Sequence, residues 1–572
     1  MKKQVLYGAA NYEEIVQKNG YFVDKTAYIE KLERVGNPVF LRPRRFGKSV
    51  LCSMLRYYYD LNYGSRFTEL FGHTWIGQHP TANRNRFIVL SLNFSNIEIG
   101  GSIKEIEQNF KQYCNAILTF LRHEYAPVLN EMPEILMDGA VSTNLAIVLH
   151  YLRAYHLPPM YVIIDEYDNL ANQLITAHKD SLYRELTADS FLKTFFKTLK
   201  EGREIGAITN VFITGVLPVT MDDMASGYNI ASFITLRPKF EKMLGFTQTE
   251  VDKLLDDIYH DYEIDPSSRR EVGAIIKNSY DGYHFVTYDG ESLYNSTLLM
   301  YFLNQLVEDQ TIPTQLIDMN LKTEIAWVKR LTASNIQNTE DFVDQLTLHN
   351  KIGYDNALMV EKFNLFQFFE NRFFPVSFFY LGMLTKKDHF YLELPNLNLR
   401  QIFVEYFNEI HNLDVSSRYS EIMQRFVNAP NLEQLFAGYW EQYVSQLPEV
   451  IFQQVNENFF RTTFFELCSR YLSNWFTWHV ERSYPRGKSD LEFVGKYHEK
   501  FAGLRWVIEF KYYSNSKFKE FKTTIEKFEL RDEDTQQIAG YVEGLKEEYP
   551  EAKISQFVIY CIGNQGFRVF AV

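Results

Sequence analysis

Short apolar runs alternate with longer amphipathic stretches along residues 1–238. The short runs are rich in Val, Ile and Phe and predict buried strands. The stretches between them predict helices, because their apolar residues recur at spacings of three and four, as in Ile103–Tyr125. This alternation is typical of an α/β fold with a parallel sheet. The expected strands are Val39–Leu41, Phe87–Asn93, Tyr161–Asp165 and Val211–Thr214.

The pattern becomes helical over residues 239–335, where Thr247-Gln-Thr-Glu250 is a capping box that opens a helix and Tyr280–Phe285 is a turn. We expect this segment to be a helical lid on the α/β core. Residues 336–428 contain helical runs and the alternating segment Asp388–Leu394, which favours a winged-helix-like region. Such a region binds DNA or packs between domains, and packing is favoured here because no basic stripe accompanies it.

Strands return in residues 429–572, after the boundary signal Asn428-Ala-Pro-Asn431. A helix is expected over Phe459–Trp478, followed by a hairpin whose strands are Asp490–Val494 and Leu504–Tyr512. We therefore expect a second α/β domain at this end of the chain.

Composition narrows the class of protein. The 572 residues are too many for one core, and an apolar fraction of 46% with 23% charged residues is typical of globular proteins. The formal charge of −13 argues against bulk attraction to nucleic acid or an anionic membrane, so any DNA contact is expected to be local. Four cysteines without C-x-x-C spacing, no secretory signal and no long apolar run favour a cytoplasmic protein without a membrane span.

The first chemical motif is Arg42-Pro-Arg-Arg-Phe-Gly-Lys-Ser49, directly after the first strand. In the pattern G-x-x-x-x-G-K-[ST], backbone N–H groups cradle phosphates, Lys reaches the β/γ-phosphates and the hydroxyl binds Mg²⁺. Gly47, Lys48 and Ser49 fit this pattern, whereas Arg42 replaces the first glycine. The flanking strand and helix provide the context that the motif requires. The alternative is a chance Gly-Lys-Ser at a helix start.

Two further strands end in polar residues. Asp165 ends the strand Tyr161–Asp165 and is expected to hold Mg²⁺, while Glu166 would polarise the attacking water. Thr214 ends the next strand and could contact the γ-phosphate; the alternative for Asp165 alone is a solvated strand end. The ordered motifs predict a P-loop nucleotide-binding fold. Its candidate binding residues are Arg42, Pro43, Arg44, Arg45, Phe46, Gly47, Lys48, Ser49, Asp165 and Thr214, with Ser49 and Asp165 as metal ligands.

A second group of chemical residues lies in the C-terminal hairpin. Glu509 and Lys511 share one face of a strand because side chains alternate, and Asp490 lies on the neighbouring strand. Two carboxylates suit a hard divalent cation and an ammonium can position water, as metal-dependent phosphodiester hydrolysis requires. Glu466, among apolar residues of the preceding helix, is a candidate further metal ligand because an unpaired buried carboxylate is costly. The alternative is an exposed strand with alternating charges.

Together these motifs resemble a prokaryotic family that joins an AAA-like ATPase domain to a C-terminal PD-(D/E)XK nuclease domain. In that family R-P-R-R-F-G-K-S is the usual loop, so Arg42 agrees with it. The resemblance on the ATPase side rests on Tyr21–Thr26, Arg42–Ser49, Val162–Glu166 and Tyr280–Phe285. On the nuclease side, the segments similar to the G-R-x-D, E-x-K and Q-x-x-x-Y signatures are Arg486–Asp490, Ile508–Lys511 and Gln537–Tyr541.

The resemblance implies ATP and Mg²⁺ at the first site, and Mg²⁺ or Mn²⁺ at Asp490 and Glu509 with Lys511 catalytic and Gln537 accessory. Lys488 stands where the family often has Arg, which keeps the charge but loses bidentate phosphate bonding. The predicted function is an ATP-binding and ATP-hydrolysing protein coupled to a metal-dependent nuclease, whose partner is nucleic acid, DNA first. A homo-oligomer is compatible with the sequence. The alternative is a nucleotide-switched interaction module whose nuclease-like domain binds a partner without cleavage.

Overall fold

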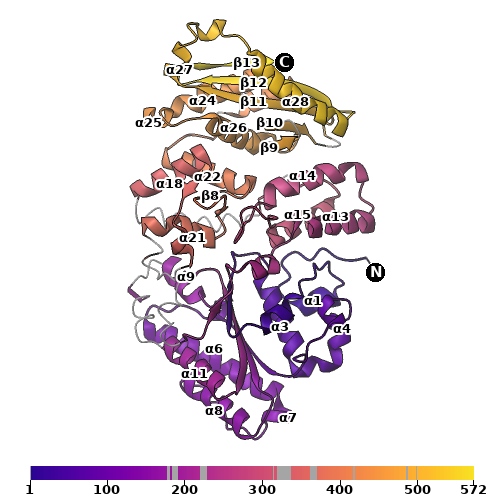
Figure 1. Ribbon diagram of the computed structural model, residues 1–572, viewed down its shortest axis with the longest axis vertical. Coiled ribbons are helices and arrows are strands. Elements are labelled where there is room, and N and C mark those ends of the chain that lie inside the picture. The colour runs from indigo at the N-terminus through magenta and orange to yellow at the C-terminus, as the bar shows by residue number, and fades with distance from the viewer. Residues whose placement is uncertain are drawn as a thin grey trace.

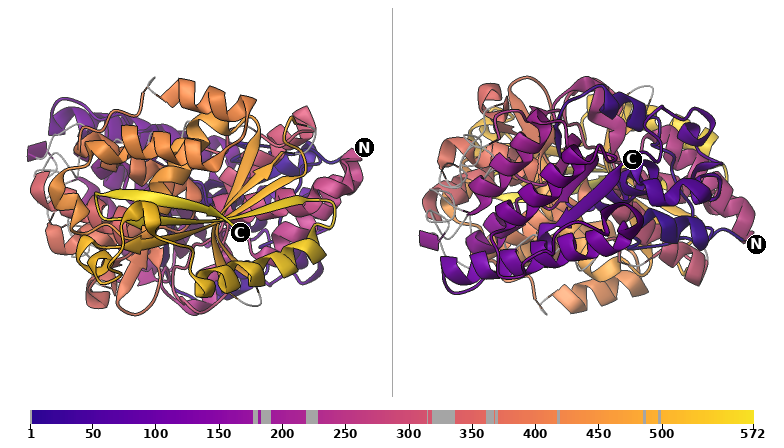
Figure 2. Two further views of the ribbon diagram at one scale, coloured as in Figure 1. Left: turned by 90° about the horizontal axis from the view of Figure 1, so that it is seen from above. Right: turned by 90° about the horizontal axis from the view of Figure 1, so that it is seen from below.

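The molecule is a tall stack with a sheet at each end. Figure 1 shows an N-terminal α/β unit at the base, two helical groups above it and a second α/β unit at the top, and Figure 2 shows the C-terminal sheet from above. The computed structural model describes residues 2–176, 181–182, 191–218, 228–313, 315–317, 336–360, 367, 370–416, 419–484, 487–496 and 499–572.

The N-terminal unit is built on a five-stranded parallel sheet in the order β2-β3-β4-β1-β5. Its central strands are almost wholly buried, as expected for a parallel sheet covered on both faces. Helices α1, α3 and α4 lie on one side and α6, α8 and α11 on the other (Figure 1), so the predicted α/β fold is confirmed. The strands are β1 Pro38–Leu41, β2 Ile88–Asn93, β3 Met160–Asp165, β4 Ile208–Gly215 and β5 Ser232–Phe233. The helices are α1 Tyr12–Gln17, α2 Tyr28–Glu33, α3 Lys48–Tyr59, α4 Phe67–Phe71, α5 Trp75–Gln78, α6 Ile103–Glu124, α7 Ala126–Leu129, α8 Val141–Ala154, α9 Asn169–Thr176 and α11 Phe191–Glu204.

The long helix α6 matches the predicted segment Ile103–Tyr125 to within one residue. Ser102 caps it by accepting the N–H of Glu105, and a stripe that includes Phe110 and Leu118 is buried. Helix α6 is therefore amphipathic and covers the sheet. Across the described ranges, no helix combines the length and apolar character needed to cross a bilayer.

Three helices follow the parallel sheet in the segment expected to form the lid, α13 Gln248–Tyr262, α14 Arg269–Tyr280 and α15 Ser296–Asp309. Residues 314 and 318–335 of that segment lie outside the described residues. The predicted capping box is confirmed, because the Thr247 hydroxyl accepts the Glu250 N–H while the Glu250 carboxylate accepts the Thr247 N–H. The three helices pack around an apolar core of their own.

The middle region combines helices with a small antiparallel sheet in the order β6-β8-β7. The alternating segment Asp388–Leu394 contains β8, which pairs antiparallel with β7. Residues 361–366, 368–369 and 417–418 of the predicted winged-helix-like region lie outside the described residues. The elements are α18 Ile336–His349, β6 Ile352–Gly353, α19 Asn356–Val360, α21 Phe374–Tyr380, β7 Thr385–Lys386, β8 Tyr391–Glu393, α22 Leu397–Ile410 and α23 Ser420–Asn428.

The C-terminal unit has a mixed five-stranded sheet in the order β13-β12-β11-β10-β9. Strands β11 and β12 are parallel, and the other neighbouring pairs are antiparallel. The strands are β9 Phe476–Tyr484, β10 Gly487–Gly495, β11 Leu504–Tyr513, β12 Lys553–Ile562 and β13 Gly566–Ala571. The helices are α24 Leu432–Gln442, α25 Glu449–Phe452, α26 Glu457–Leu472, α27 Asn515–Lys519 and α28 Asp532–Glu548.

The predicted helix Phe459–Trp478 is wrong at its C-terminal end. Helix α26 stops at Leu472, and Phe476 already begins β9. There the rings of Phe476 and Trp478 pack on Phe493 of the neighbouring strand, with centroids 5.8 and 5.9 Å apart. Apolar residues run through both elements, so hydrophobic periodicity alone did not mark the junction.

Candidate functional sites

The loop between β1 and α3 leads directly into the N-terminus of α3. Arg45 and Gly47 have left-handed backbones, with φ of 69° and 91°, and Gly47 is the N-cap residue of α3. This conformation is unfavourable for a residue with a side chain, so the surrounding structure must hold Arg45 in it. The free N–H groups and dipole of a helix start favour an anion, which is the geometry expected of a phosphate cradle.

Side chains from β3 meet the first turn of α3. The Ser49 hydroxyl donates a hydrogen bond to Asp165 over 2.7 Å. Lys48 Nζ donates to two carbonyl oxygens of the loop and lies 3.8 Å from Glu166. Burial raises the pKa of Asp165, and the Ser49 hydrogen bond partly offsets this. Four predicted site residues therefore gather at the carboxyl edge of the parallel sheet, where ligands bind in such folds.

The structure does not bring the Arg42 side chain into this group. Its guanidinium is only 1% exposed and lies between the rings of Phe40 and Phe285, at 4.4 and 4.3 Å from their centroids. It also donates hydrogen bonds to the carbonyl oxygens of Thr235 and Glu241. From this position the guanidinium cannot contact a phosphate, so its contribution is to anchor the loop to the segments that follow the sheet.

Thr214 is likewise turned into the sheet. Its side chain is fully buried and its hydroxyl donates to the Phe40 carbonyl oxygen over 2.7 Å, so it does not reach the edge where Asp165 lies. Sequence reasoning missed Asp168, whose carboxylate accepts the N–H groups of Val216 and Leu217 just after β4. The signal for Asp168 was present as a further acidic residue after the strand.

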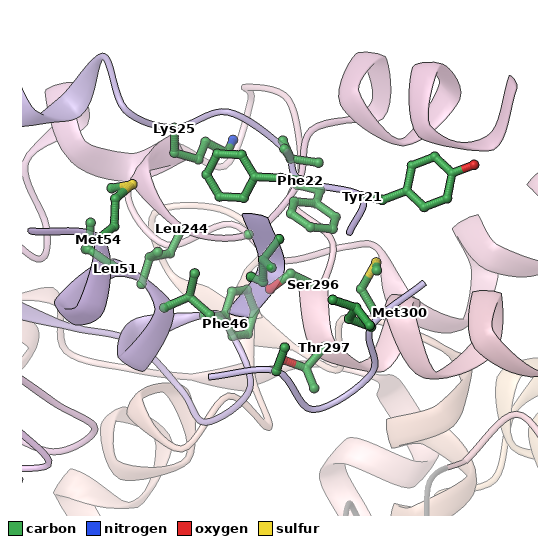
Figure 3. Close-up of a pocket in the computed structure, with 18 of the residues that line it drawn as sticks. Tyr21, Phe22, Lys25, Phe46, Leu51, Met54, Leu244, Ser296, Thr297 and Met300 are labelled. Carbon is green, nitrogen blue, oxygen red and sulfur yellow. The ribbon is translucent and has the colours of Figure 1, made fainter. Parts of the chain in front are cut away.

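A largely apolar cavity lies beside the loop (Figure 3). It has about 800 Å³ of empty volume, its open mouth included. Lys25 lines it and pairs with Glu250 over 2.7 Å. The sequence could not predict this cavity, since its walls come from the N-terminal segment, α3 and the lid. Lining residues include Phe22, Phe46, Gly47, Leu51, Leu244 and Met300.

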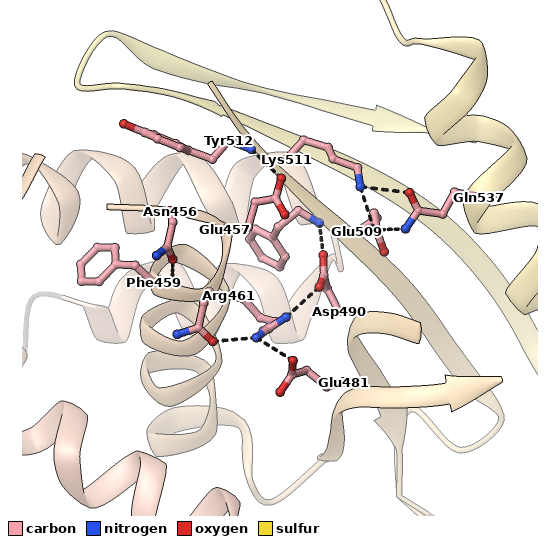
Figure 4. Close-up of polar contacts among 12 residues, drawn as sticks. Asn456, Glu457, Phe459, Arg461, Glu481, Asp490, Glu509, Lys511, Tyr512 and Gln537 are labelled. Carbon is pink, nitrogen blue, oxygen red and sulfur yellow. Dashed lines mark hydrogen bonds and ion pairs between the residues drawn. The ribbon is translucent and has the colours of Figure 1, made fainter. Parts of the chain in front are cut away.

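The C-terminal motif residues converge between β10, β11 and α28 (Figure 4). Lys511 Nζ donates to the Oε1 atoms of Glu509 and Gln537, each over 3.0 Å. Gln537 Nε2 donates to the same Glu509 oxygen over 2.6 Å. On β10, Asp490 accepts the Phe510 N–H over 2.8 Å, which fixes it beside β11. The antiparallel hairpin thus places Glu509 and Lys511 on one face with Asp490 next to them, as the alternation of side chains predicts.

The Glu509 carboxylate fits a divalent cation. It is 3% exposed, and its Oε2 is buried without a hydrogen-bond partner among the described residues. Burial and the nearby Asp490 carboxylate raise the pKa of Glu509 to about 8, against the effect of Lys511. A divalent cation would satisfy this oxygen and offset the repulsion between the two carboxylates. Among the described residues, no three or more His, Cys, Asp or Glu side chains are grouped as ligands for a metal.

Glu466 is not brought to this cluster. It forms an ion pair with Arg470 on the same helix, and it lines a separate cavity with Gln401 and Ser469. The prediction that Glu466 is a further metal ligand is therefore corrected. Its carboxylate lies on another face of α26, and its ion pair with Arg470 offsets the cost of burying it.

Two other residues of α26 reach the cluster instead. Arg461 donates to Asp490 over 2.7 Å, and Glu457 accepts the Tyr512 N–H over 3.3 Å (Figure 4). Sequence reasoning missed both, because only the fold shows which face of α26 meets the hairpin. Arg486, in the predicted signature before Asp490, lies outside the described residues.

The fold and its two groups of side chains define a protein that combines a P-loop nucleotide-binding unit with a nuclease-like unit. Residues 6–225 match the family described as "Predicted AAA-ATPase", and residues 455–571 match the PD-(D/E)XK nuclease superfamily. The chain thus carries one AAA-ATPase-like domain and one PD-(D/E)XK domain, and the resemblance seen in the sequence is confirmed.

One curated relative gives no further guide to activity. The chain is 24% identical over 330 residues to an "Uncharacterized protein in vnfD 5'region" of Azotobacter chroococcum mcd 1. The match covers 56% of this chain and 56% of that protein, so the chain spans little more than half the length of this relative.

Proposed function

We propose that the protein binds and hydrolyses ATP at the loop between β1 and α3 and couples this to a metal-dependent nuclease at its C-terminal end. The substrate of the nuclease is nucleic acid, with DNA as the first candidate. The observation that carries the proposal is that both motif sets, though scattered in sequence, are assembled in one chain. One set is the Ser49–Asp165 pair, and the other is the contact of Lys511 with Glu509 beside Asp490.

In the proposed nucleotide site, N–H groups at the start of α3 and Lys48 hold the phosphates. Ser49 and Asp165 hold Mg²⁺, and Glu166 orients the attacking water. The cavity of Figure 3 is continuous with the loop through Phe46 and Gly47 and would receive the apolar faces of the nucleoside. For Lys48, binding requires exchange of its hydrogen bonds to loop carbonyls for bonds to phosphate oxygens.

In the proposed nuclease site, Asp490 and Glu509 hold Mg²⁺ or Mn²⁺, and the ion supplies charge neutralisation at the scissile phosphate. Lys511 lies against Glu509, and its ammonium group would position the attacking water. Gln537 contacts both Glu509 and Lys511, so it holds the two side chains in register with each other. The enclosure of this cluster strengthens each of these interactions.

Paired variants test the two halves separately. We expect Lys48→Ala to lower ATP turnover, and Asp490→Asn to lower DNA cleavage in Mn²⁺, each by about 10²-fold or more. Lys111→Ala and Glu433→Gln, at surface positions away from both sites, serve as matched controls. Full turnover by Lys48→Ala would remove the ATPase proposal. Absence of cleavage by the unaltered protein, under every nucleotide condition, would remove the nuclease proposal.

The competing function, a nucleotide-switched module that binds a partner without cleavage, is favoured by one contact. The Asp490 carboxylate already pairs with a cation, Arg461, over 2.7 Å. Calorimetry distinguishes the two functions, because only a metal-dependent nuclease should bind Mn²⁺ through Glu509 and lose that binding in Glu509→Gln.

A further inference from the structure

A line of alternating charges runs from the middle region to the nuclease carboxylate. Arg400 on α22 donates to Glu481 on β9 over 2.9 Å. The other oxygen of Glu481 lies 3.3 Å from Arg461 Nη2 on α26. Arg461 Nη1 in turn donates to Asp490 Oδ1 on β10 over 2.7 Å (Figure 4). Arg461 therefore contacts two carboxylates: Asp490, in the proposed metal site, and Glu481, outside it.

The arrangement is enclosed and held under constraint. The Arg461 side chain is only 8% exposed, while those of Asp490 and Glu481 are 17% and 31% exposed, so solvent screens its charge less at Asp490 than at Glu481. Burial raises the pKa of Glu481, but Arg400 and Arg461 outweigh it and bring the value to about 2, so Glu481 remains ionised. Glu481 also has a left-handed backbone with φ of 54°, a conformation that a glutamate keeps only when its surroundings hold it.

Helix α22 is attached to the ATPase side of the molecule as well. Its N-cap residue Asn396 donates to the carbonyl oxygen of Asp281, in the turn after lid helix α14. Just before β7, Gly382 lies so close to the loop that a Cβ on it would be 2.5 Å from Pro43 Cβ. The middle region therefore contacts the proposed nucleotide loop through Gly382 and carries Arg400 on α22.

We propose that Arg461 is a positioning residue shared between Asp490 and Glu481, and that Arg400 sets this sharing, so the middle region controls the divalent-metal affinity of the nuclease site. The inference rests on the proposed nuclease function and adds its regulation. It assigns to α22 a role that neither matched domain covers, since α22 lies between residues 225 and 455.

The sign of the effect follows from the charges. Without Arg400, Glu481 keeps Arg461 and the smaller influence of Lys488 as its cations, so it draws the guanidinium further from Asp490 and leaves more negative potential for a metal. Without the Glu481 charge, Arg461 keeps its hydrogen bonds to Asp490 and to the Asn458 side-chain oxygen, and its positive charge beside Asp490 repels the metal. The two neutralising changes, Arg400→Gln and Glu481→Gln, are therefore expected to alter metal affinity in opposite directions.

Calorimetric titration of the full chain with Mn²⁺ tests the proposal. We expect Arg400→Gln to tighten binding roughly fivefold and Glu481→Gln to weaken it roughly fivefold. Arg400→Lys keeps the charge and should stay near the unaltered affinity. Arg372→Gln removes an arginine of the middle region that pairs with Glu370 instead, so it controls for net charge. In cleavage assays, the same variants should shift the Mn²⁺ concentration for half-maximal rate and leave kcat within about twofold.

The outcomes separate this inference from the proposed function. If the unaltered protein binds no Mn²⁺ through Glu509, the proposed nuclease site itself is wrong. If it does bind, and Arg400→Gln and Glu481→Gln both match Arg372→Gln, the sharing of Arg461 has no effect and the inference is overturned. Equal melting temperatures among the variants confirm that a change in affinity is not a loss of fold. A kcat lowered with an unchanged metal requirement would also overturn it.

Discussion

Glu509 is the residue whose surroundings depart most from what its sequence suggests. The E-x-K spacing predicts its neighbour Lys511, because alternation along a strand is a local property. The unpartnered oxygen and the raised pKa come from burial and from Asp490, which is 19 positions away on another strand. The roles of Lys48 and Ser49 were similarly predictable, because both residues directly follow Gly47 in the loop motif. The burial of Arg42 was not, since its partners Thr235, Glu241 and Phe285 are distant in sequence.

The pKa of Glu509 predicts how stability varies with pH in the absence of metal. Its ordinary value of 4.5 is raised to about 8 in the folded protein. Between these values the folded state holds a proton that the unfolded state has released, so this group's contribution to stability is lost as pH rises. We expect the free energy of unfolding of Glu509→Gln, relative to that of the unaltered protein, to rise by about 2–4 kcal/mol between pH 5 and pH 9.

Urea denaturation in EDTA at these two pH values measures the difference. Glu520→Gln, an exposed position on the same domain, should show no such trend. Added Mn²⁺ should restore the unaltered protein at pH 9 and have little effect on Glu509→Gln. An equal response of the two proteins to pH would mean that Glu509 ionises as in water.

At the scale of elements, the sequence was most informative where a segment has one periodicity and clear ends. The capping box at Thr247 and the buried run Tyr161–Asp165 are such cases, and both appear where expected. The end of α26 was missed because the aromatic residues of β9 continue the apolar run. Gly382 was overlooked for another reason: its importance lies in a contact with Pro43 that no local pattern reveals.

Gly382→Ala is expected to disturb the junction between the middle region and the loop. Gly382 has a φ of 79°, and a Cβ would meet the rigid ring of Pro43. Gly206→Ala is a matched control, because Gly206 has a φ of 73° but nothing within 4 Å of an added Cβ. We expect a loss of about 2–4 kcal/mol for Gly382→Ala against about 1 kcal/mol for the control.

Chemical denaturation and binding of a fluorescent ATP analogue measure both effects. Only Gly382→Ala should weaken nucleotide binding, since only that change displaces Pro43. Equal losses in the two variants would show that backbone strain, and not the contact with the loop, accounts for the result.

At the scale of the whole molecule, the lid contacts the nuclease unit directly. Arg270 on α14 donates to the carbonyl oxygen of Glu548 and pairs with its carboxylate, both at 3.1 Å. Asn278 on the same helix donates to His479 on β9 over 2.8 Å. Glu548 is the last residue of α28, the helix that carries Gln537. The sequence could predict the two domains but not this junction. Its residues match no motif, and their contacts form only when the two domains lie side by side.

This junction predicts that nucleotide state alters cleavage. We expect a non-hydrolysable ATP analogue to change the DNA cleavage rate of the unaltered protein by roughly fivefold, a typical coupling between sites. Lys48→Ala should abolish the response, and Arg270→Ala should reduce it while leaving nucleotide affinity intact. Arg153→Ala, on the exposed surface of α8, is the control. A full response in Arg270→Ala would place the coupling elsewhere.

The burial of Arg42 also bears on the order in which the chain is made. When synthesis has passed residue 238, the loop is complete, yet the carbonyl oxygen of Glu241 and the ring of Phe285 have not emerged. A charged guanidinium in an apolar setting then lacks these two partners, which is costly. The nascent N-terminal unit should therefore remain loosely packed for several more seconds at ordinary rates of translation. We therefore expect the smallest fragment of this protein that can fold by itself to end after the lid. A fragment that ends at the last strand of the parallel sheet would lack part of this folding unit.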